Sequence, residues 1–225
     1  MTTMHDLFSD WQQQPYINIT LILIMFVMFG LLTLSGGSDS AAVLLRYGAQ
    51  SNPLIQAGQW WRLVTPIFLH IGLQHLLLNC LTLFYVGNLL EKTVGHFRYL
   101  VLFLGSGIGG NLFSFAAGNV ISAGSSTAIF GLLGVFLMLS LVVRGNLLIT
   151  ETGITFAVFV GLNLLTDFFV PQIDIWGHLG GLLTGFCLAF VVGVPSLVKL
   201  AKKTRFFYAN VLFIGIIVLC YIGMA

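Results

Sequence analysis

The sequence predicts an all-α polytopic membrane protein, and its composition and its apolar runs both point to this fold class. Hydrophobic residues make up 58% of the 225 residues and charged residues only 7%, against roughly 25% charged residues in a soluble globular domain. The mean hydropathy is +1.01. The apolar runs are continuous, whereas the strands of a transmembrane β-barrel alternate between polar and apolar residues.

The same composition excludes several other classes of protein. Intrinsic disorder needs low hydrophobicity and high net charge, but the formal net charge here is only +2. That charge is also too small to suggest a nucleic-acid partner. Three cysteines are too few for a secreted disulfide scaffold. All three lie within apolar runs, where we interpret them as small hydrophobic residues.

Seven stretches are expected to cross the bilayer, because a spanning helix needs about 20 apolar residues. They are residues 16–35, 75–92, two helices within 99–143, 148–169, 175–194 and 206–224. The charge-free stretch 99–143 is too long for one span, and Gly118 and Asn119 supply a turn within it. The first span is not interpreted as a signal peptide, because no Lys or Arg precedes it.

The distribution of Lys and Arg predicts a cytoplasmic N-terminus and a C-terminus on the outside. With residues 1–15 as a short inner tail, the inner loops carry seven basic residues, namely Lys92, Arg98, Arg144, Lys199, Lys202, Lys203 and Arg205. The outer loops carry only Arg46 and Arg62. The N-terminus lacks an Arg-rich transit peptide, which favours a bacterial plasma membrane over a mitochondrion.

The long segment 36–74 between the first two spans is expected to carry structure of its own. A loop of this length is usually functional or structured. It contains the adjacent tryptophans Trp60 and Trp61, and tryptophan favours the membrane interface. We therefore expect this segment to associate with the bilayer surface.

Polar side chains near the outer ends of three spans form the candidate site. Strongly polar groups inside a membrane are costly and are candidates for function. Spans two, four and six run in the same direction, and their first turns carry His75, Asn79, Ser126 and His178. At about 1.5 Å per residue, these four groups lie roughly 5–10 Å below their helix starts, at one common depth.

This set contains the groups that acyl transfer requires. Ser126 becomes a nucleophile if a general base lies within hydrogen-bond distance, and His178 can be that base. His75 and Asn79 are four residues apart, so they share one helix face and offer N–H donors to an oxyanion. The backbone N–H of Ser126, near a helix N-terminus, is a further donor.

Small residues on two spans predict that the serine and histidine helices pack closely. Gly181 and Gly185 form a small-xxx-small pattern in span six, which lets another helix approach. Span four offers Gly124, Ala128 and Gly131 at matching spacings. Close packing of these two faces would bring the nucleophile and the base together.

Five motifs occur in a fixed order along the chain. They are Trp61-Arg62, His75-x-x-x-Asn79, Glu91-x3-Gly95-x2-Arg98, Gly124-Ser125-Ser126 with Ile129-Phe130-Gly131, and His178-x-x-Gly181-x-x-x-Gly185. Together they resemble the motifs of the rhomboid intramembrane serine proteases. The resemblance covers residues 16–194, a six-helix core that includes the loop 36–74. It leaves residues 195–225 as a basic cytoplasmic loop and a seventh helix outside the chemistry.

The resemblance implies a rhomboid-like six-helix bundle with a Ser–His dyad, in which Ser126 is the nucleophile and His178 the general base. It implies that His75, Asn79 and the Ser126 amide bind the oxyanion. The substrate would be a transmembrane segment of another membrane protein, which enters laterally near span five and is cleaved near its outer end. Neither a cofactor nor a metal ion is expected.

Other polar residues leave room for more than one interpretation. Asp174 either orients His178 as a third member or caps span six, and the cap is favoured because Asp is a common N-cap residue. Asp167 is expected to be solvated at the outer end of span five. His70 either lines a water-filled cavity or has a structural role. Thr127 stands where the family often has glycine, and its stiff β-branched side chain is expected to narrow the cleft.

Three residues outside the chemistry are assigned structural roles. Arg62 is expected to pin the first loop through hydrogen bonds. Glu91 and Arg98 flank one short inner turn and are expected to pair with each other.

Three alternative functions are weighed against the protease. An inactive rhomboid-like binding protein would lack the nucleophile or the base; both are present, and Thr127 keeps this alternative open. A transporter or channel is less favoured, because no charged residue occupies the middle of a span and no internal repeat is found. A metalloprotease is not favoured, because no HExxH motif occurs. The substrate and the oligomeric state stay open.

Overall fold

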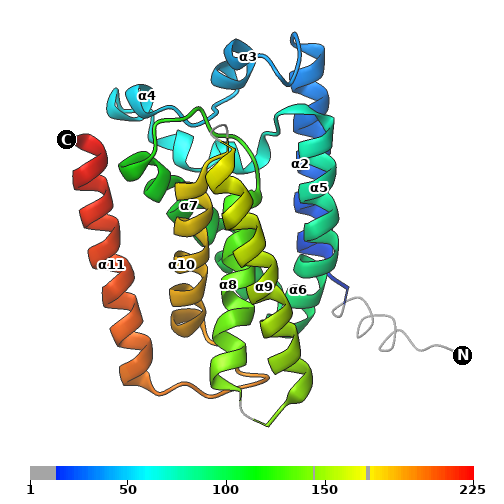
Figure 1. The fold of residues 1–225 in the computed structure, drawn as a ribbon, viewed down its shortest axis with the longest axis vertical. Helices are drawn as coiled ribbons and strands as arrows, with labels where there is room; N and C mark the ends of the chain where they lie inside the picture. The colour runs from blue at the N-terminus through cyan, green and yellow to red at the C-terminus, as the bar shows by residue number, and fades with distance from the viewer. Residues whose placement is uncertain (1–13, 144, 171–172) are drawn as a thin grey trace, which may run out of the picture.

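The structure is a computed structural model that describes residues 14–143, 145–170 and 173–225. These residues form helices, connecting turns and two isolated β-bridges, which confirms the all-α prediction. The long helices run side by side as a bundle, and the short helices α3 and α4 lie at one end of it (Figure 1). Arg144 and most of the tail 1–15, which the topology prediction placed inside, lie outside the described residues.

Within the described part of the chain, six helices are long and apolar enough to cross a membrane. They are α2 (Tyr16–Leu34), the continuous helix of α5 (Gly72–Thr82), the π-helical η3 (Leu83–Gly87) and α6 (Asn88–Val94), then α7 (His96–Ala117), α9 (Leu147–Phe169), α10 (Ile175–Val192) and α11 (Lys202–Met224). With the shorter apolar helix α8 (Ser126–Val142), these match the seven stretches expected from the sequence. Both α5 and α11 begin earlier than expected, because helical hydrogen bonding continues through polar residues that hydropathy excludes.

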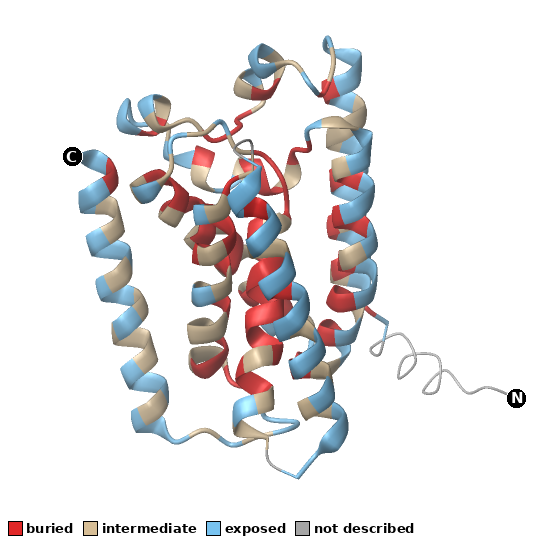
Figure 2. Cartoon of the chain, in the orientation of Figure 1, coloured by how far each residue is buried: buried red, intermediate tan, exposed pale blue. Residues whose placement is uncertain are grey.

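Helix α8 is the centre of the bundle. It packs against α7, α9 and α10 and is buried along most of its length (Figure 2). Its 17 residues extend about 25 Å at 1.5 Å per residue, less than the roughly 30 Å of a hydrocarbon core. Because α8 is surrounded by other helices, its first residue, Ser126, begins inside the bundle.

Two glycines bring α10 into backbone contact with α8. A Cβ atom at Gly181 would lie 2.0 Å from the carbonyl oxygen of Thr127, and one at Gly185 would lie 2.1 Å from that of Gly131. The glycine pattern of α10 therefore faces α8, as the sequence indicated. The expected face of α8 was wrong at two of its three positions. Thr127 and Gly131, four residues apart, face α10, whereas Ala128 packs against α7 and Gly124 lies before α8 and faces His75.

The first loop carries four short helices and is held by an arginine. They are α3 (Ala41–Arg46), α4 (Asn52–Gln56), η1 (Trp60–Leu63) and η2 (Thr65–Phe68). The buried Arg62 donates from Nη1 to the carbonyl oxygen of Ala49 (2.7 Å) and from Nε to Oε1 of Gln59 (2.7 Å). Trp60 and Trp61 remain exposed, which suits residues at a membrane interface.

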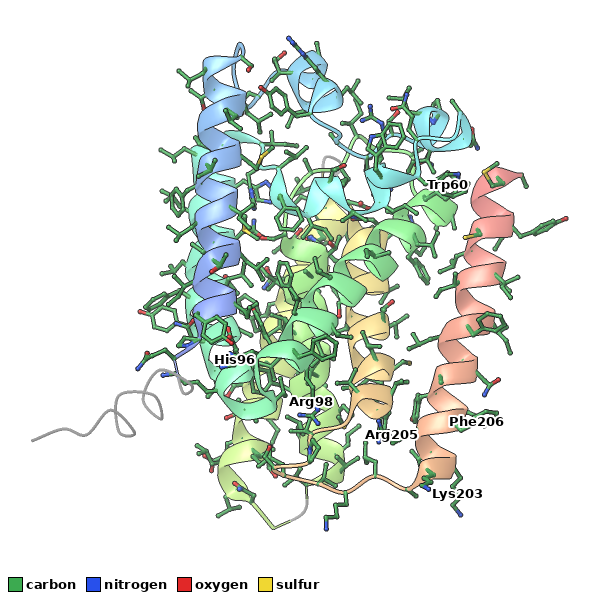
Figure 3. The ribbon with its side chains drawn as sticks, turned by 180° about the vertical axis from the view of Figure 1, so that it is seen from behind. Trp60, His96, Arg98, Lys203, Arg205 and Phe206 are labelled. Carbon is green, nitrogen blue, oxygen red and sulfur yellow. The ribbon has the colours of Figure 1, made fainter. Side chains whose placement is uncertain are left out.

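A buried carboxylate joins three helices at the opposite end of the bundle. Oε1 of Glu91 accepts the N–H of Ile17 (3.1 Å) and Oε2 accepts the N–H of Asn18 (2.7 Å), both in the first turn of α2. Oε1 also lies 2.5 Å from Nδ1 of His96. The expected pairing of Glu91 with Arg98 is wrong: Arg98, at the same end (Figure 3), donates to the backbone of α6. The N–H groups at a helix start attract a carboxylate. No pattern in the sequence around Glu91 reveals that its partners are Ile17 and Asn18.

Candidate active site

Three helix starts bring the candidate residues together. His75 lies in the first turns of α5, Ser126 is the first residue of α8, and His178 lies in the first turn of α10. The segment before α8 is held by a hydrogen bond from the N–H of Gly124 to the carbonyl oxygen of Pro66 (2.9 Å). Gly124 has a φ of +152°, and a Cβ there would lie 2.6 Å from Cε1 of His75. Only glycine fits at position 124, between His75 of α5 and the start of α8.

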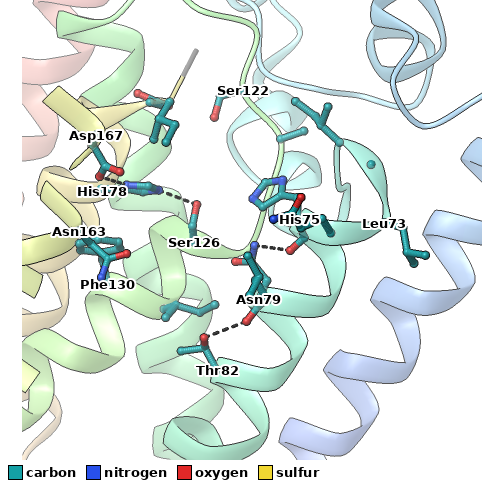
Figure 4. A pocket seen from close by; sticks show the side chains of 18 of the residues that line it. Leu73, His75, Asn79, Thr82, Ser122, Ser126, Phe130, Asn163, Asp167 and His178 are labelled. Atoms are coloured by element: carbon teal, nitrogen blue, oxygen red, sulfur yellow. Dashed lines mark hydrogen bonds and ion pairs between the residues drawn. The ribbon is translucent and has the colours of Figure 1, made fainter. Parts of the chain in front are cut away.

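The serine and the histidine are directly hydrogen-bonded. Oγ of Ser126 lies 2.8 Å from Nε2 of His178, as Figure 4 shows. Phe130, one turn further along α8, stacks on the imidazole ring with centroids 4.3 Å apart and an interplanar angle of 9°. The sequence placed Phe130 in the serine motif without a role. Its ring holds the plane of the imidazole, and the pair has the geometry in which a histidine can take a hydroxyl proton.

The second nitrogen of His178 meets a carboxylate. Oδ2 of Asp167 lies 2.6 Å from Nδ1 of His178, and Asp167 is buried. The expectation that Asp167 is solvated is therefore wrong. Only residues 170–174 separate α9 from α10, so the last turn of α9 must lie against the first turn of α10. This short connection is the feature of the sequence from which the contact could have been predicted.

Asp174 caps α10, as the sequence favoured. Its Oδ1 accepts the N–H of Gly177 at 2.9 Å, which satisfies one of the free donors of the helix start. The carboxylate that reaches His178 is thus that of Asp167, and the alternative interpretation of Asp174 as the third member is not supported.

The two side chains predicted to bind the oxyanion, His75 and Asn79, lie on the other side of Ser126 from His178 (Figure 4). Nδ2 of Asn79 donates one hydrogen to the carbonyl oxygen of His75 (2.8 Å). Oδ1 of Asn79 accepts the hydroxyl hydrogen of Ser125 (3.2 Å). The amide is thereby oriented while its second hydrogen stays available to another acceptor.

These groups share one cavity of about 670 Å³. Ser126, His178, His75 and Asn79 all line it, together with residues of the last turns of α9. Its walls also include Leu78 of α5 and Phe159 of α9, which are 56% and 41% exposed. The cavity therefore extends from the Ser–His pair to the lateral surface of the bundle, between α5 and α9.

The family model described as the Rhomboid domain matches residues 57–195. The chain belongs to the rhomboid family. It is 40% identical over 190 residues to rhomboid protease GluP of Bacillus subtilis, covering 84% of this chain and 37% of that protein. It is 38% identical over 136 residues to the putative rhomboid protease YdcA of the same organism, covering 60% and 68%. It is 36% identical over 157 residues to rhomboid-like protease 1 of Toxoplasma gondii, covering 68% and 54%.

The chain thus spans between about a third and two thirds of the length of these rhomboid relatives. The rhomboid domain match includes Ser126, His178 and Asp167, and also His75 and Asn79, the two side chains predicted to bind the oxyanion. The match begins at residue 57, so it leaves α2 and the first part of the first loop outside.

Thr127, where rhomboid sequences often have glycine, does not narrow the cavity. Its side chain is buried and faces the glycines of α7 and α10, lying 2.8 Å from a Cβ built at Gly110 and 3.0 Å from one built at Gly177. It is not among the residues that line the cavity. The expectation that Thr127 narrows the cleft is therefore wrong, because one step of 100° along α8 turns it away from Ser126.

The buried His70 supports the segment that precedes Ser126. His70 is fully buried, and its Nε2 accepts the backbone N–H of Ser125 (3.4 Å), the residue just before Ser126. It does not line the cavity, so the structural interpretation of His70 fits better than the cavity one. Burial, followed by the proximity of His75, lowers the pKa of His70 to about 3.

This buried neutral imidazole predicts a loss of stability in acid. Because the unfolded chain binds a proton near pH 6.5 and the folded one only near pH 3, stability is complete above pH 6.5 and falls as the pH drops. The free energy of unfolding should decrease by about 2 kcal/mol between pH 6.5 and pH 5, at about 1.4 kcal/mol per pH unit. Thermal unfolding in detergent measures this. The variant His70→Gln, which keeps an acceptor without a titrating ring, should lose less; equal losses would contradict the assignment.

Proposed function

We propose that this rhomboid-family protein is an intramembrane serine endopeptidase that cleaves transmembrane segments of other membrane proteins. The observation that carries the proposal is the hydrogen bond of 2.8 Å between Oγ of Ser126 and Nε2 of His178, at the edge of a cavity inside an apolar bundle. A serine in a membrane helix usually bonds to its own helix backbone; this one points to a histidine on another helix.

The proposed reaction follows from the positions of these atoms. Nε2 of His178 takes the hydroxyl proton of Ser126 while Oγ attacks the carbonyl carbon of the scissile peptide bond. The negative charge on the carbonyl oxygen is stabilised by the second amide hydrogen of Asn79, by an N–H of His75 and by the backbone N–H of Ser126.

The second half of the reaction reverses the proton transfer. The imidazolium of His178 gives its proton to the leaving amine, the C–N bond breaks and an ester on Oγ remains. A water molecule, deprotonated by the same nitrogen, then attacks the ester carbon. The bond between this carbon and Oγ breaks, the imidazolium returns its proton to Oγ, and the second product leaves as a carboxylic acid. No cofactor or metal ion enters this scheme.

The shape of the cavity supports a membrane-embedded substrate. It extends between the exposed side chains of α5 and α9, so an extended segment can reach Ser126 from the side of the bundle. A substrate helix must unwind locally before its carbonyl can be attacked, and small or helix-breaking residues make this easier. We therefore propose cleavage near the outer end of the substrate span.

The distribution of cations supports an N-terminus inside and a C-terminus outside. Arg98, Lys203 and Arg205 lie at one end of the bundle and Trp60 at the other (Figure 3). Positive residues favour the cytoplasmic side, so the cavity, which lies toward the end of Trp60, would face the outside. A bacterial plasma membrane is the proposed location.

A reconstituted cleavage assay tests the proposed function. The purified protein in liposomes is incubated with a single-span substrate that has small residues near its outer end, and the products are mapped by mass spectrometry. Cleavage by the wild type and a loss of at least about 1,000-fold in Ser126→Ala and in His178→Ala are expected. Ser122→Ala removes the hydroxyl of another cavity-lining serine and should leave cleavage nearly unchanged.

Two outcomes would contradict the proposal. Cleavage by Ser126→Ala at the wild-type rate would exclude Ser126 as the nucleophile. A wild type that retains the substrate, yet neither cleaves it nor reacts with a fluorophosphonate probe, would point to a rhomboid-like binding protein instead.

A further inference from the structure

We infer that Asp167 is a positioning residue for the general base, so that Ser126, His178 and Asp167 act as one array across three helices. The inference rests on the proposed function, because it concerns the same reaction. It goes beyond a Ser–His dyad by giving the carboxylate at the end of α9 a part in the chemistry.

The contact is direct and shielded from water. Oδ2 of Asp167 lies 2.6 Å from Nδ1 of His178, and the two side chains are only 5% and 10% exposed. A buried carboxylate needs a hydrogen-bond donor, and the imidazole N–H supplies it. A charge-assisted hydrogen bond of this length is among the stronger contacts available to a side chain.

The carboxylate fixes which nitrogen of His178 carries the proton. An ionised carboxylate can only accept hydrogen bonds, so Nδ1 carries the hydrogen and Nε2 keeps its lone pair. That lone pair faces Oγ of Ser126, 2.8 Å away, which is the arrangement that a general base requires. When Nε2 takes the proton of the serine, the negative charge of Asp167 stabilises the imidazolium without becoming protonated itself.

A second contact shows why the carboxylate is needed. Phe130 stacks on the imidazole at an angle of 9°, and this contact fixes the plane of the ring. Stacking alone does not distinguish this ring from one rotated by 180° about its Cβ–Cγ bond, which has the same plane but a different position of Nδ1 and Nε2. The hydrogen bond to Asp167 removes this ambiguity, so the two neighbours together leave His178 one productive orientation.

A matched control lies only a few residues away. Asp174 is also buried near the start of α10, but its Oδ1 accepts the N–H of Gly177 (2.9 Å) instead of contacting the imidazole. The variant Asp174→Asn removes one negative charge and keeps the capping oxygen. A general effect of charge near the site would appear in both Asp→Asn variants, whereas a positioning effect would appear only at Asp167.

The test measures cleavage, probe reaction and stability together. Wild type, Asp167→Asn, Asp167→Glu and Asp174→Asn are reconstituted as full chains in liposomes. For Asp167→Asn we expect kcat to fall by about 100-fold or more, KM to stay within about twofold, and the rate of fluorophosphonate labelling of Ser126 to fall in parallel. Asp167→Glu, which keeps a carboxylate, should retain at least about tenfold more activity than Asp167→Asn, and Asp174→Asn should match the wild type.

The outcomes separate this inference from the proposed function. If the wild type cleaves but Asp167→Asn keeps kcat within about threefold, or changes only KM, the inference is overturned alone. A glutamate variant as inactive as the asparagine one would likewise overturn it. If the wild type neither cleaves nor reacts with the probe, the proposed function is contradicted, and the inference, which rests on it, is contradicted as well. Should Asp167→Asn not be recovered folded, as judged by its melting curve, Asp167→Ser takes its place under the same criteria.

Discussion

Replacing Gly185 with alanine is expected to push α8 and α10 apart and to lower both stability and activity. The new Cβ would lie 2.1 Å from the carbonyl oxygen and 2.5 Å from the Cα of Gly131, whereas ordinary contacts begin near 3.4 Å. Both opposing atoms belong to the helix backbone, so no side chain can turn aside. Overpacking of this kind typically costs about 1–3 kcal/mol.

The loss of activity follows from where the reacting groups are mounted. Ser126 lies on α8 and His178 on α10, and their hydrogen bond of 2.8 Å depends on the spacing of these two helices. Relief of the clash needs a shift of about an ångström, and a displacement of that size can lower a reaction rate about 100-fold. We therefore expect Gly185→Ala to lose about 100-fold in cleavage even at temperatures where it stays folded.

A second glycine supplies the control for this prediction. A Cβ at Gly161, in α9, meets nothing within 4 Å, so Gly161→Ala should keep wild-type cleavage. It should also match or exceed the wild-type melting temperature, because alanine is a better helix former than glycine by up to about 1 kcal/mol. Melting curves in detergent and cleavage rates in liposomes measure both effects. If Gly185→Ala behaved like Gly161→Ala, the close packing of α8 and α10 would not hold the site together.

The helices and the serine–histidine pair could be predicted from the sequence because both depend on strong, local patterns. Apolar runs of about 20 residues define spanning helices. Spans that run in the same direction place Ser126 and His178 at one depth, and glycines four residues apart indicate which helix faces approach. Each of these arguments needs only spacing along the chain and the thickness of a membrane.

The remaining features depend on contacts between different helices or on the rotation of a helix about its axis. Asp167 meets His178 because α9 and α10 form a tight hairpin, yet an aspartate near a helix end is usually solvated. Thr127 points away from the cavity because of its rotation on α8, and spacing alone did not fix the face that meets α10. Glu91 accepts hydrogen bonds from the start of α2, which lies more than 70 residues away in the chain. A sequence pattern around Glu91 cannot show this contact.

Replacing Glu91 with alanine is expected to lower the free energy of unfolding by about 3–5 kcal/mol, the cost of breaking a buried charged contact on one side. The carboxylate is fully buried and accepts the N–H groups of Ile17 and Asn18 and a contact from His96. The residue before α2 is Pro15, which provides no capping side chain. Without Glu91, the N–H groups of Ile17 and Asn18 lose their acceptor, and the positive end of the helix loses its counter-charge.

The measurement is a melting curve in detergent, with Glu151→Gln as the control. Glu151 lies exposed near the start of α9, so removing its charge should change stability by less than about 0.5 kcal/mol. The isosteric Glu91→Gln keeps one accepting oxygen and should fall between Glu91→Ala and the wild type. Because Glu91 lies at the end of the bundle away from Ser126, the fraction that remains folded should cleave at the wild-type rate. A Glu91→Ala protein as stable as Glu151→Gln would show that α2 is held by its apolar contacts alone.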